Sequence, residues 1–382
     1  MEEQISIVRC PDYHYPRVLK KVKEVLDPLG GIGAFVSRGD RVLLKPNLLY
    51  AKHPDRAVTT HPAMVQAVAE LVVERGAVPI IGDSPGVGSL RRVAAQAGIT
   101  QVAEHMDCAL TEFTGVVGVR TDASFTFRKL EVAKAVLEVD VVINLPKVKT
   151  HGMMLLTLAV KNTFGCVPGM RKAQWHLKAG IDHLHFAGML VELCKTVSPA
   201  VTITDGIVAM EGNGPGGGDP RRLGLIMAGK DPVALDTAVC RIVGLPPSTL
   251  PTVQAAQQRG LGQAEHGPIT VRGEPIEAVM MRDFRVPKRH DLQWNLPGFM
   301  KRPLKRIVVP KTAINPSLCK ACGTCIAVCP AKAIVVRNTC AKIDYGKCIR
   351  CYCCQEMCPE GAIHIKGALV GGLCREEHQI HH

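Results

Sequence analysis

The stretch from Cys319 to Pro359 reads CKACGTCIAVCPAKAIVVRNTCAKIDYGKCIRCYCCQEMCP, and it decides the fold of the C-terminal part of the chain. It contains the pattern Cys-x2-Cys-x2-Cys-x3-Cys-Pro twice. Every cysteine of the first run recurs 29 positions later in the second, so the stretch is an internal duplication. Thiolates at this spacing wrap an iron–sulfur cubane, and the sequence therefore predicts two [4Fe–4S] clusters.

The spacing also predicts which cysteines share a cluster. The first three cysteines of a run have two residues between neighbours, and their thiolates reach three irons of one cube. The fourth cysteine, which is followed by proline, ligates the other cube. This rule assigns one cluster to Cys319, Cys322, Cys325 and Cys358, and the other to Cys348, Cys351, Cys354 and Cys329. Residues 313–370 resemble two-cluster ferredoxins of the bacterial type. Outside the pattern fall three cysteines that we expect to be spectators, Cys340, Cys353 and Cys374.

A zinc site or a disulfide framework is the alternative interpretation of this stretch. Zinc sites more often use two CxxC pairs with four ligands in all, and disulfides need an oxidising compartment. The chain begins without the basic and apolar segments of a secretory signal, and no apolar run approaches the ~20 residues that cross a bilayer. We therefore expect a cytoplasmic protein, in a reducing environment that keeps thiolates available.

Length and composition predict two domains joined by a linker. With 382 residues, 47% of them hydrophobic, the chain can bury the core of an ordinary α/β domain beside a small domain. We expect the α/β domain at residues 1–283, a basic linker at 284–312 and a small α+β ferredoxin-like domain at 313–382. Region 282–310 is rich in Lys and Arg, so it could contact a membrane surface, but packing along the ferredoxin-like domain is favoured.

The charge of the chain restricts its partners. The formal net charge is +13, and two clusters of about −2 each leave the holoprotein basic. A basic protein favours a redox partner protein with acidic groups, or a small anionic or phosphorylated substrate. Nucleic acid is not expected, because aromatic residues make up only 4% of the chain and no helix-turn-helix or finger pattern occurs.

Along the N-terminal part, apolar runs of strand length alternate with helical patterns four or five times. This alternation predicts a three-layer α/β domain with a largely parallel sheet. Polar residues lie at or just after the carboxyl ends of the expected strands at 41–47, 78–82 and 139–145. In open α/β sheets, ligands gather at the carboxyl ends of the strands, so these positions are candidate site residues.

The polar residues at the strand ends predict an anion site. The candidate catalytic residues are Lys147, Lys149, His151 and Lys161, and the candidate substrate-binding residues are Lys45, Asn47, Asp83, Ser84 and Asn162. Lysines would hold an anionic substrate, and a histidine or a lysine with a depressed pKa would deliver a proton. A solvated basic loop is the alternative interpretation of residues 147–161.

Several segments resemble one family, the proteins called "domain of unknown function 362": VLLKPN (42–47), GDSPG (82–86), NLPKVKTH (144–151), KNTFG (161–165) and the DG to AGKDPVALD segment (205–236). Many members of that family carry a C-terminal two-cluster ferredoxin module. The resemblance implies an iron–sulfur protein with a redox role. The order of Lys149, His151, Lys161 and Pro168-Gly169 is also similar to the core of nickel-pincer lactate racemases, in which glycines precede the lysine; here residues 158–160 are Leu-Ala-Val.

Three functions are compatible with these features. The first is an oxidoreductase that passes electrons from two [4Fe–4S] clusters to an anionic substrate or cofactor held by the N-terminal domain. The second is a non-enzymatic, ferredoxin-like electron carrier or adaptor, whose polar strand ends would bind a redox partner. The third is a non-redox enzyme similar to the nickel-pincer racemases, with clusters that serve stability or sensing.

Overall fold

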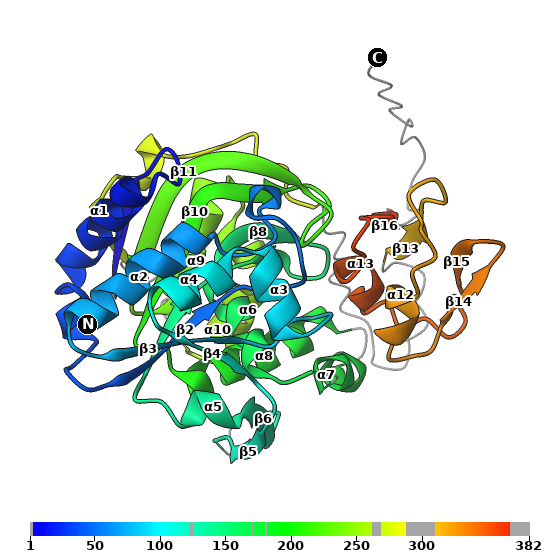
Figure 1. The fold of residues 1–382 in the computed structure, drawn as a ribbon. Helices are drawn as coiled ribbons and strands as arrows, with labels where there is room; N and C mark the ends of the chain where they lie inside the picture. The colour runs from blue at the N-terminus through cyan, green and yellow to red at the C-terminus, as the bar shows by residue number, and fades with distance from the viewer. Residues whose placement is uncertain are drawn as a thin grey trace.

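The computed structural model describes residues 3–122, 125–169, 171–179, 182–261, 269–287 and 310–366. They form an α/β domain with a smaller cysteine-rich module beside it (Figure 1). Most of the expected linker, residues 288–309, lies outside the described residues. Its packing, its contact with a membrane and the domain boundaries therefore stay predictions. No helix in the described part of the chain is both long and apolar enough to cross a membrane.

The centre of the α/β domain is one large mixed sheet. Its strands lie in the order β12 (Ile269–Gly273), β1 (Glu3–Arg9), β11 (Asp219–Gly229), β10 (Val201–Glu211), β7 (Val141–Leu145), β2 (Arg41–Pro46), β3 (Val78–Asp83) and β4 (Ala109–Glu112). Neighbours are parallel except at β11, which is antiparallel to both β1 and β10. Strand β8 (Lys147–His151) also pairs with the long β10, and β9 (Leu155–Thr157) pairs with β8. The predicted largely parallel sheet is confirmed.

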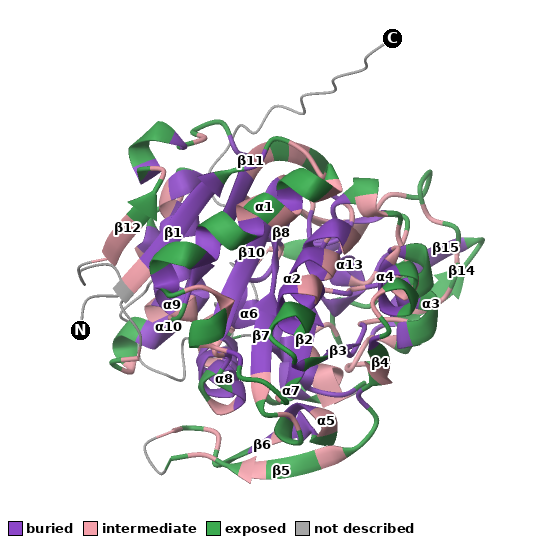
Figure 2. Ribbon diagram, turned by 60° about the vertical axis from the view of Figure 1, so that its left-hand side comes forward, coloured by how far each residue is buried: buried purple, intermediate pink, exposed green. Residues whose placement is uncertain are grey.

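Both faces of the sheet are covered, so the central strands are buried throughout. In β2, Leu43 packs into one hydrophobic cluster, whereas Val42 and Leu44 pack into the other, as the period of two in a strand requires. Such strands are continuously apolar rather than alternating. Figure 2 shows the buried strands inside a layer of helices with exposed outer faces. The predicted three-layer architecture follows from these two cores.

The helices divide between the two faces. Against one face pack α1 (Tyr15–Leu26), α2 (Pro62–Glu74), α3 (Leu90–Gln96) and α4 (Ile99–His105). Against the other lie α5 (Lys134–Leu137), α6 (Ala159–Asn162), α7 (Arg171–Ala179), α8 (His183–Val197), α9 (Pro232–Ile242) and α10 (Pro251–Gln258). Helix α9 has a capped N-terminus. The Asp231 side chain accepts a hydrogen bond from the Val233 amide, and Pro232 occupies the first turn. A separate hairpin joins β5 (Val116–Arg120) to β6 (Lys129–Ala133).

The cysteine-rich module is built from the two copies of the duplicated stretch. Its elements are β13 (Lys311–Ile314), α12 (Thr324–Ala327), β14 (Ile334–Arg337), β15 (Cys340–Ile343), α13 (Cys353–Glu356) and β16 (Ile363–Lys366). The first strand pairs with the last, and β14 pairs with β15, both antiparallel. A small core that includes Ile334, Ala362 and Ile363 lies between the copies. The predicted α+β ferredoxin-like module is confirmed.

The module contacts the α/β domain through α13. The side-chain amide of Gln355 donates to Asn213 Oδ1 and to the Gly214 carbonyl, at 2.8 Å each. Both acceptors lie in the connection between β10 and β11. A glycine at position 86 is needed for close approach, because a Cβ there would lie 2.3 Å from Met357 Sδ. The second cysteine copy is therefore held against the carboxyl ends of the strands.

Candidate functional site

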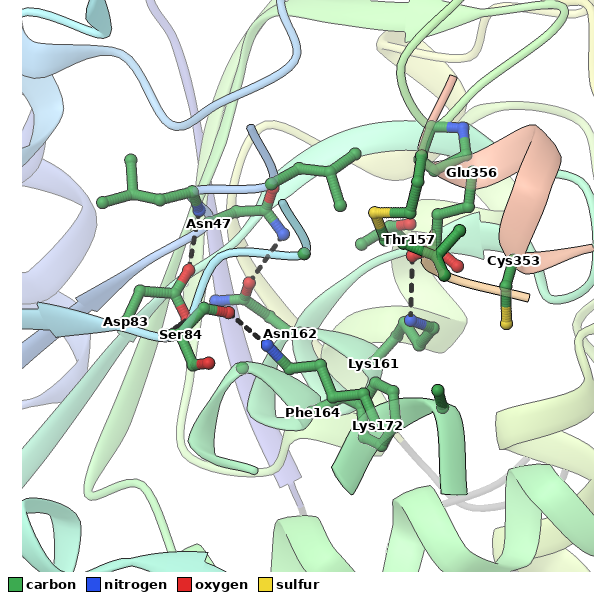
Figure 3. A pocket seen from close by; sticks show the side chains of 18 of the residues that line it. Asn47, Asp83, Ser84, Thr157, Lys161, Asn162, Phe164, Lys172, Cys353 and Glu356 are labelled. Carbon is green, nitrogen blue, oxygen red and sulfur yellow. Dashed lines mark hydrogen bonds and ion pairs between the residues drawn. The ribbon is translucent and has the colours of Figure 1, made fainter. Parts of the chain in front are cut away.

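A cavity lies where the strand ends of the α/β domain meet α13 of the cysteine-rich module (Figure 3). Its empty volume is about 760 Å³, the open mouth included, which is within the range of small-molecule sites. Of the predicted site residues, seven line it: Lys45, Asn47, Asp83, Ser84, Lys149, Lys161 and Asn162. The sequence did not indicate other lining residues, among them Thr157, Lys172, His176, Cys353, Glu356 and Met357.

A buried ion pair forms the floor of the cavity. Lys45 Nζ lies 2.8 Å from Asp83 Oδ1, and both side chains are almost completely buried. Asp83 also accepts hydrogen bonds from the amides of Leu48 and Ser84, at 2.7 and 2.9 Å. The chain passes so close that a Cβ at Gly165 would lie 2.0 Å from Asp83 Oδ1. This pair joins the ends of β2 and β3 and gives the cavity a rigid base.

We expect Asp83→Ala to lower the free energy of unfolding by about 3–5 kcal/mol, because the substitution leaves Lys45 buried without its counter-charge. Thermal denaturation followed by circular dichroism measures the effect. The matched control is Asp55→Ala, which removes a carboxylate that is 82% exposed and pairs with His53. An exposed pair of this kind contributes little. Equal losses for the two variants would contradict the structural role of the Lys45–Asp83 pair.

Two amides continue the polar wall from this floor. The side chain of Asn47 donates to Asn162 Oδ1 at 2.9 Å, and Asn162 donates to Asn144 Oδ1 at 2.8 Å. The free oxygen of Asn47 accepts a hydrogen bond from Lys149 Nζ at 2.8 Å. The carboxyl ends of β2 and β7 are thereby connected to β8 and α6. The predicted convergence of the strand-end residues is thus present in the structure.

Two lysines of the cavity have depressed pKa values. Burial lowers the pKa of Lys149 to about 7, although the Glu356 carboxylate opposes the shift. Burial likewise lowers the pKa of Lys172 to about 8, with Asp83 opposing. Lys172 lies in α7 and donates to the carbonyls of Ser84 and Pro85. Burial therefore favours the uncharged forms of both lysines, and an anion in the cavity would favour their charged forms.

The opposite wall is the carboxylate of Glu356 in α13. Lys161 Nζ lies 3.7 Å from Glu356 Oε1, and His151 Nε2 lies 3.3 Å from Oε2. Burial disfavours the charged carboxylate, but Lys161 and His151 outweigh it and hold the pKa of Glu356 well below its usual value. His151 Nδ1 accepts the amides of Met153 and Met154, which places its proton on Nε2, facing the carboxylate.

Two buried polar atoms of the cavity have no hydrogen-bond partner among the described residues. They are Thr157 Oγ1 and His176 Nδ1, both in side chains that line the cavity. The His176 ring stacks on Phe186 with 4.2 Å between centroids, and burial lowers its pKa to about 3, so it is neutral. Leaving such atoms unpaired is costly, but both are buried, so a ligand would reach them only after a rotation of the side chain.

Lys147 and His151 do not line the cavity. In the register of β8 with β10, Lys147 lies opposite Asp205, and its Nζ is 2.9 Å from Asp205 Oδ2 and 2.7 Å from Tyr13 Oη. Lys147 thus belongs to a separate buried network with Tyr13 and Asp205. His151 lies behind Glu356 and reaches the cavity through that carboxylate. A sequence pattern does not reveal which of several neighbouring lysines faces a charged partner.

Two smaller cavities in the module are lined by the cysteines of the duplicated stretch. One is lined by Cys319, Cys322, Cys325 and Cys358, and the other by Cys329, Cys348, Cys351 and Cys354. The amide of Ala333 points to Cys329 Sγ at 3.3 Å, and that of Arg350 to Cys348 Sγ at 3.4 Å. Four thiols around each cavity and amide donors to sulfur suit [4Fe–4S] clusters. The ligand sets proposed from the spacing agree with this grouping.

Comparison with known proteins identifies both parts of the chain. A family model described as "Domain of unknown function (DUF362)" matches residues 42–241, and one described as "4Fe-4S binding domain" matches residues 312–335 and 341–364. The chain belongs to the DUF362 family. This DUF362 protein carries two [4Fe–4S] clusters, one for each copy of the binding motif, and is an electron-carrying iron–sulfur protein.

Two curated proteins are similar to this DUF362 chain. The thylakoid-associated protein sll1697 of Synechocystis is 46% identical over 261 residues, which cover 68% of this chain and 81% of that protein. Hydrogenase-4 component A of Escherichia coli is 32% identical over 73 residues, 19% of this chain and 36% of that protein.

Two solved structures are more distant. One is the lactate racemase apoprotein of Thermoanaerobacterium thermosaccharolyticum, with a TM-score of 0.37 and 12% identity over 55% of this chain and 51% of that one. The other is a Thermotoga maritima protein, with a TM-score of 0.38 and 13% identity over 58% and 57% of the two chains.

Proposed function

We propose that this DUF362 protein is an oxidoreductase whose clusters pass electrons to an anionic substrate or cofactor bound in the cavity. One observation carries the proposal: residues next to cluster cysteines form part of the cavity wall. Val328 precedes Cys329, Cys353 precedes Cys354, and Met357 precedes Cys358. A ligand in the cavity would therefore lie beside the iron–sulfur module and the lysines at the same time.

The charges around the cavity favour an anionic ligand. Lys149, Lys161 and Lys172 line it in addition to the paired Lys45, against the carboxylates of Asp83 and Glu356. Burial disfavours the charged forms of Lys149 and Lys172. A bound anion would stabilise these charged forms, and the charged lysines would in turn stabilise the anion. A rotation of Thr157 or His176 would add a hydrogen bond to it.

The lysines and histidines have distinct proposed roles. When bound, the two [4Fe–4S] clusters supply single electrons, one from each reduced cluster. Lys149, with a pKa of about 7, is suited to give a proton to the reduced ligand, and Lys161 to stabilise its negative charge. His151 positions Glu356 and thereby Lys161, and Lys147 stabilises β8 through Asp205.

We expect anion binding to weaken as the pH rises through about 7 to 8, where Lys149 and Lys172 lose their protons. Both pKa values lie below that of free lysine, so the charged forms are complete only at lower pH. The groups that face Lys149 are Glu356, Lys161, Lys147 and Asp83. Calorimetric titration with oxalate between pH 6 and 9 measures the change, which approaches about tenfold per pH unit for one coupled proton.

The control for this titration is Lys149→Met, which keeps the length of the side chain and removes its charge. The variant should bind oxalate more weakly at pH 6 and lose the transition near pH 7, while the Lys172 transition near pH 8 remains. Comparison of two buffers with different ionisation enthalpies should show proton uptake on binding in the wild type. An affinity that does not change between pH 6 and 9 would argue against an anion site.

The enclosed cavity distinguishes this proposal from the two alternatives. A carrier that only docks partners would not need lysines buried at 1–6% exposure around a cavity. The segment before Lys161 does not suit a cofactor site like that of the nickel-pincer racemases. Its residues Leu158, Ala159 and Val160 are packed in the hydrophobic core, away from a ligand. Neither alternative explains why the second cysteine copy closes the cavity.

We place the protein in the cytoplasm, where a reducing environment favours cluster assembly. The Synechocystis relative is described as thylakoid-associated, so the cytoplasmic location could include the surface of a membrane. Cell fractionation in low and high salt separates these cases. Release of the protein from membranes by salt would identify electrostatic attachment.

A further inference from the structure

The duplication of the cysteine motif permits a comparison of equivalent surfaces within one module. In the second copy, α13 faces the α/β domain: Gln355 donates to Asn213 and Gly214, and Glu356 pairs with Lys161. The equivalent positions in the first copy, 29 residues earlier, are Ile326 and Ala327, and both are exposed. These two positions are therefore packed against the α/β domain in the second copy and exposed in the first.

The first copy presents an apolar surface with a cluster cysteine in it. We define the first cysteine loop as residues 318–327. In it Leu318 is 47% exposed and Ile326 is 38% exposed, and Cys322 is also exposed. Its counterpart Cys351 is buried. Figure 1 shows α13 toward the α/β domain, with α12 of the first copy farther out. Among the cluster cysteines, Cys322 is thus the exposed one, and in the sequence it lies between two exposed apolar residues of the loop.

The module that carries this loop has a predominantly basic surface. Lys320 lies within the loop and is exposed. Over residues 310–366 the exposed basic residues are Lys311, Lys320, Lys332, Arg337, Lys342, Lys347 and Lys366, whereas the exposed acidic residues are Asp344 and Glu360. Asp344 is paired with Lys347, which reduces the acidic character further. Such a surface attracts an acidic macromolecule and steers its approach.

We propose that the first cysteine loop is the docking site of an acidic one-electron carrier protein. The apolar side chains of Leu318 and Ile326 would form the centre of the interface and Lys320 part of its charged rim, while the other exposed basic residues of the module would steer the acidic partner. The reduced carrier loses one electron, and the cluster assigned to Cys319, Cys322, Cys325 and Cys358 gains it, without a proton or a leaving group. The second cluster would then receive the electron, because two of its assigned ligands, Cys329 and Cys354, each follow a residue of the cavity wall. The proposal goes beyond the function of the cavity and does not depend on the identity of its ligand.

The test combines Lys320→Glu and Ile326→Glu in the cluster-loaded full chain. The probe is a plant-type [2Fe–2S] ferredoxin, a small acidic carrier. We expect its affinity, measured by calorimetry with both proteins oxidised, and its rate of electron delivery, measured by stopped flow, to fall at least tenfold at low salt. The wild-type rate should decrease with ionic strength, and the variant should lose most of this dependence.

Two controls separate docking from damage to the cluster. Iron content, the electron paramagnetic resonance spectrum and reduction by photoreduced deazaflavin should stay unchanged in the double variant. Val117→Glu, on the exposed β5 of the α/β domain, should bind the ferredoxin like the wild type. Unchanged ferredoxin affinity in the double variant overturns the proposal. It is also overturned if the double variant loses binding to phosphatidylglycerol vesicles but still accepts electrons from the ferredoxin at the wild-type rate, because the loop would then be a membrane site.

Discussion

Lys161→Met should lower the rate of substrate reduction by about 10²–10³, the loss typical of removing one preorganised donor to a developing negative charge. Lys161 Nζ lies 3.7 Å from Glu356 and 4.9 Å above the Phe164 ring. Its contact with Glu356 is longer than a hydrogen bond, so its protons are available to a ligand. Methionine keeps most of the side-chain volume and removes only the charge and the donors.

The measurement for Lys161→Met is turnover of the anionic acceptor that the wild type reduces, found by screening small carboxylates and phosphates with chemically reduced protein. Iron content should remain at about eight per chain, because Lys161 is not a cluster ligand. The matched control is Lys178→Met, which changes an exposed lysine of α7 outside the cavity and should leave turnover as it is. A loss of turnover below threefold in Lys161→Met would refute its proposed role. If wild-type turnover itself is absent for every anion tested, the carrier alternative gains support.

Cys322→Ala should lower the iron content from about eight to about four per chain, because it removes a ligand from one cluster and leaves the other intact. Cys322 is exposed, so the loss of its side chain creates no buried cavity. Iron analysis of the anaerobically purified protein and electron paramagnetic resonance of the dithionite-reduced protein measure the change. The integrated spin intensity should fall to about half.

Cys353→Ala is the matched control for the cluster prediction. Cys353 is adjacent to Cys354 in sequence and lines the cavity, but it lies outside the ligand pattern and is absent from both cysteine-lined cavities. Its replacement should leave about eight irons per chain. A halved iron content in Cys353→Ala, or zinc in place of iron in the wild type, would disprove the ligand assignment made from the spacing.

The strand ends predict some residues of the cavity but not others. The residues that follow β2 and β3, such as Lys45 and Asp83, come together because parallel strands end at one edge of the sheet. Lys147 and Lys149 are both lysines of strand β8, but of the two only Lys149 lines the cavity. The register of β8 against β10 places Lys147 beside Asp205, and that register depends on strands about fifty residues apart.

The sequence by itself determined the clusters and their proposed ligands, because the geometry of a cubane is satisfied by cysteines at short, repeated spacings. It also determined the α/β architecture, because buried parallel strands and the helices between them have recognisable local patterns. Only the tertiary structure decided which cysteine copy faces the domain. Glu356 and Cys353 are part of the cavity wall because α13 packs against the strand ends. No local sequence pattern specifies this contact between distant segments. The same packing leaves the first cysteine loop exposed.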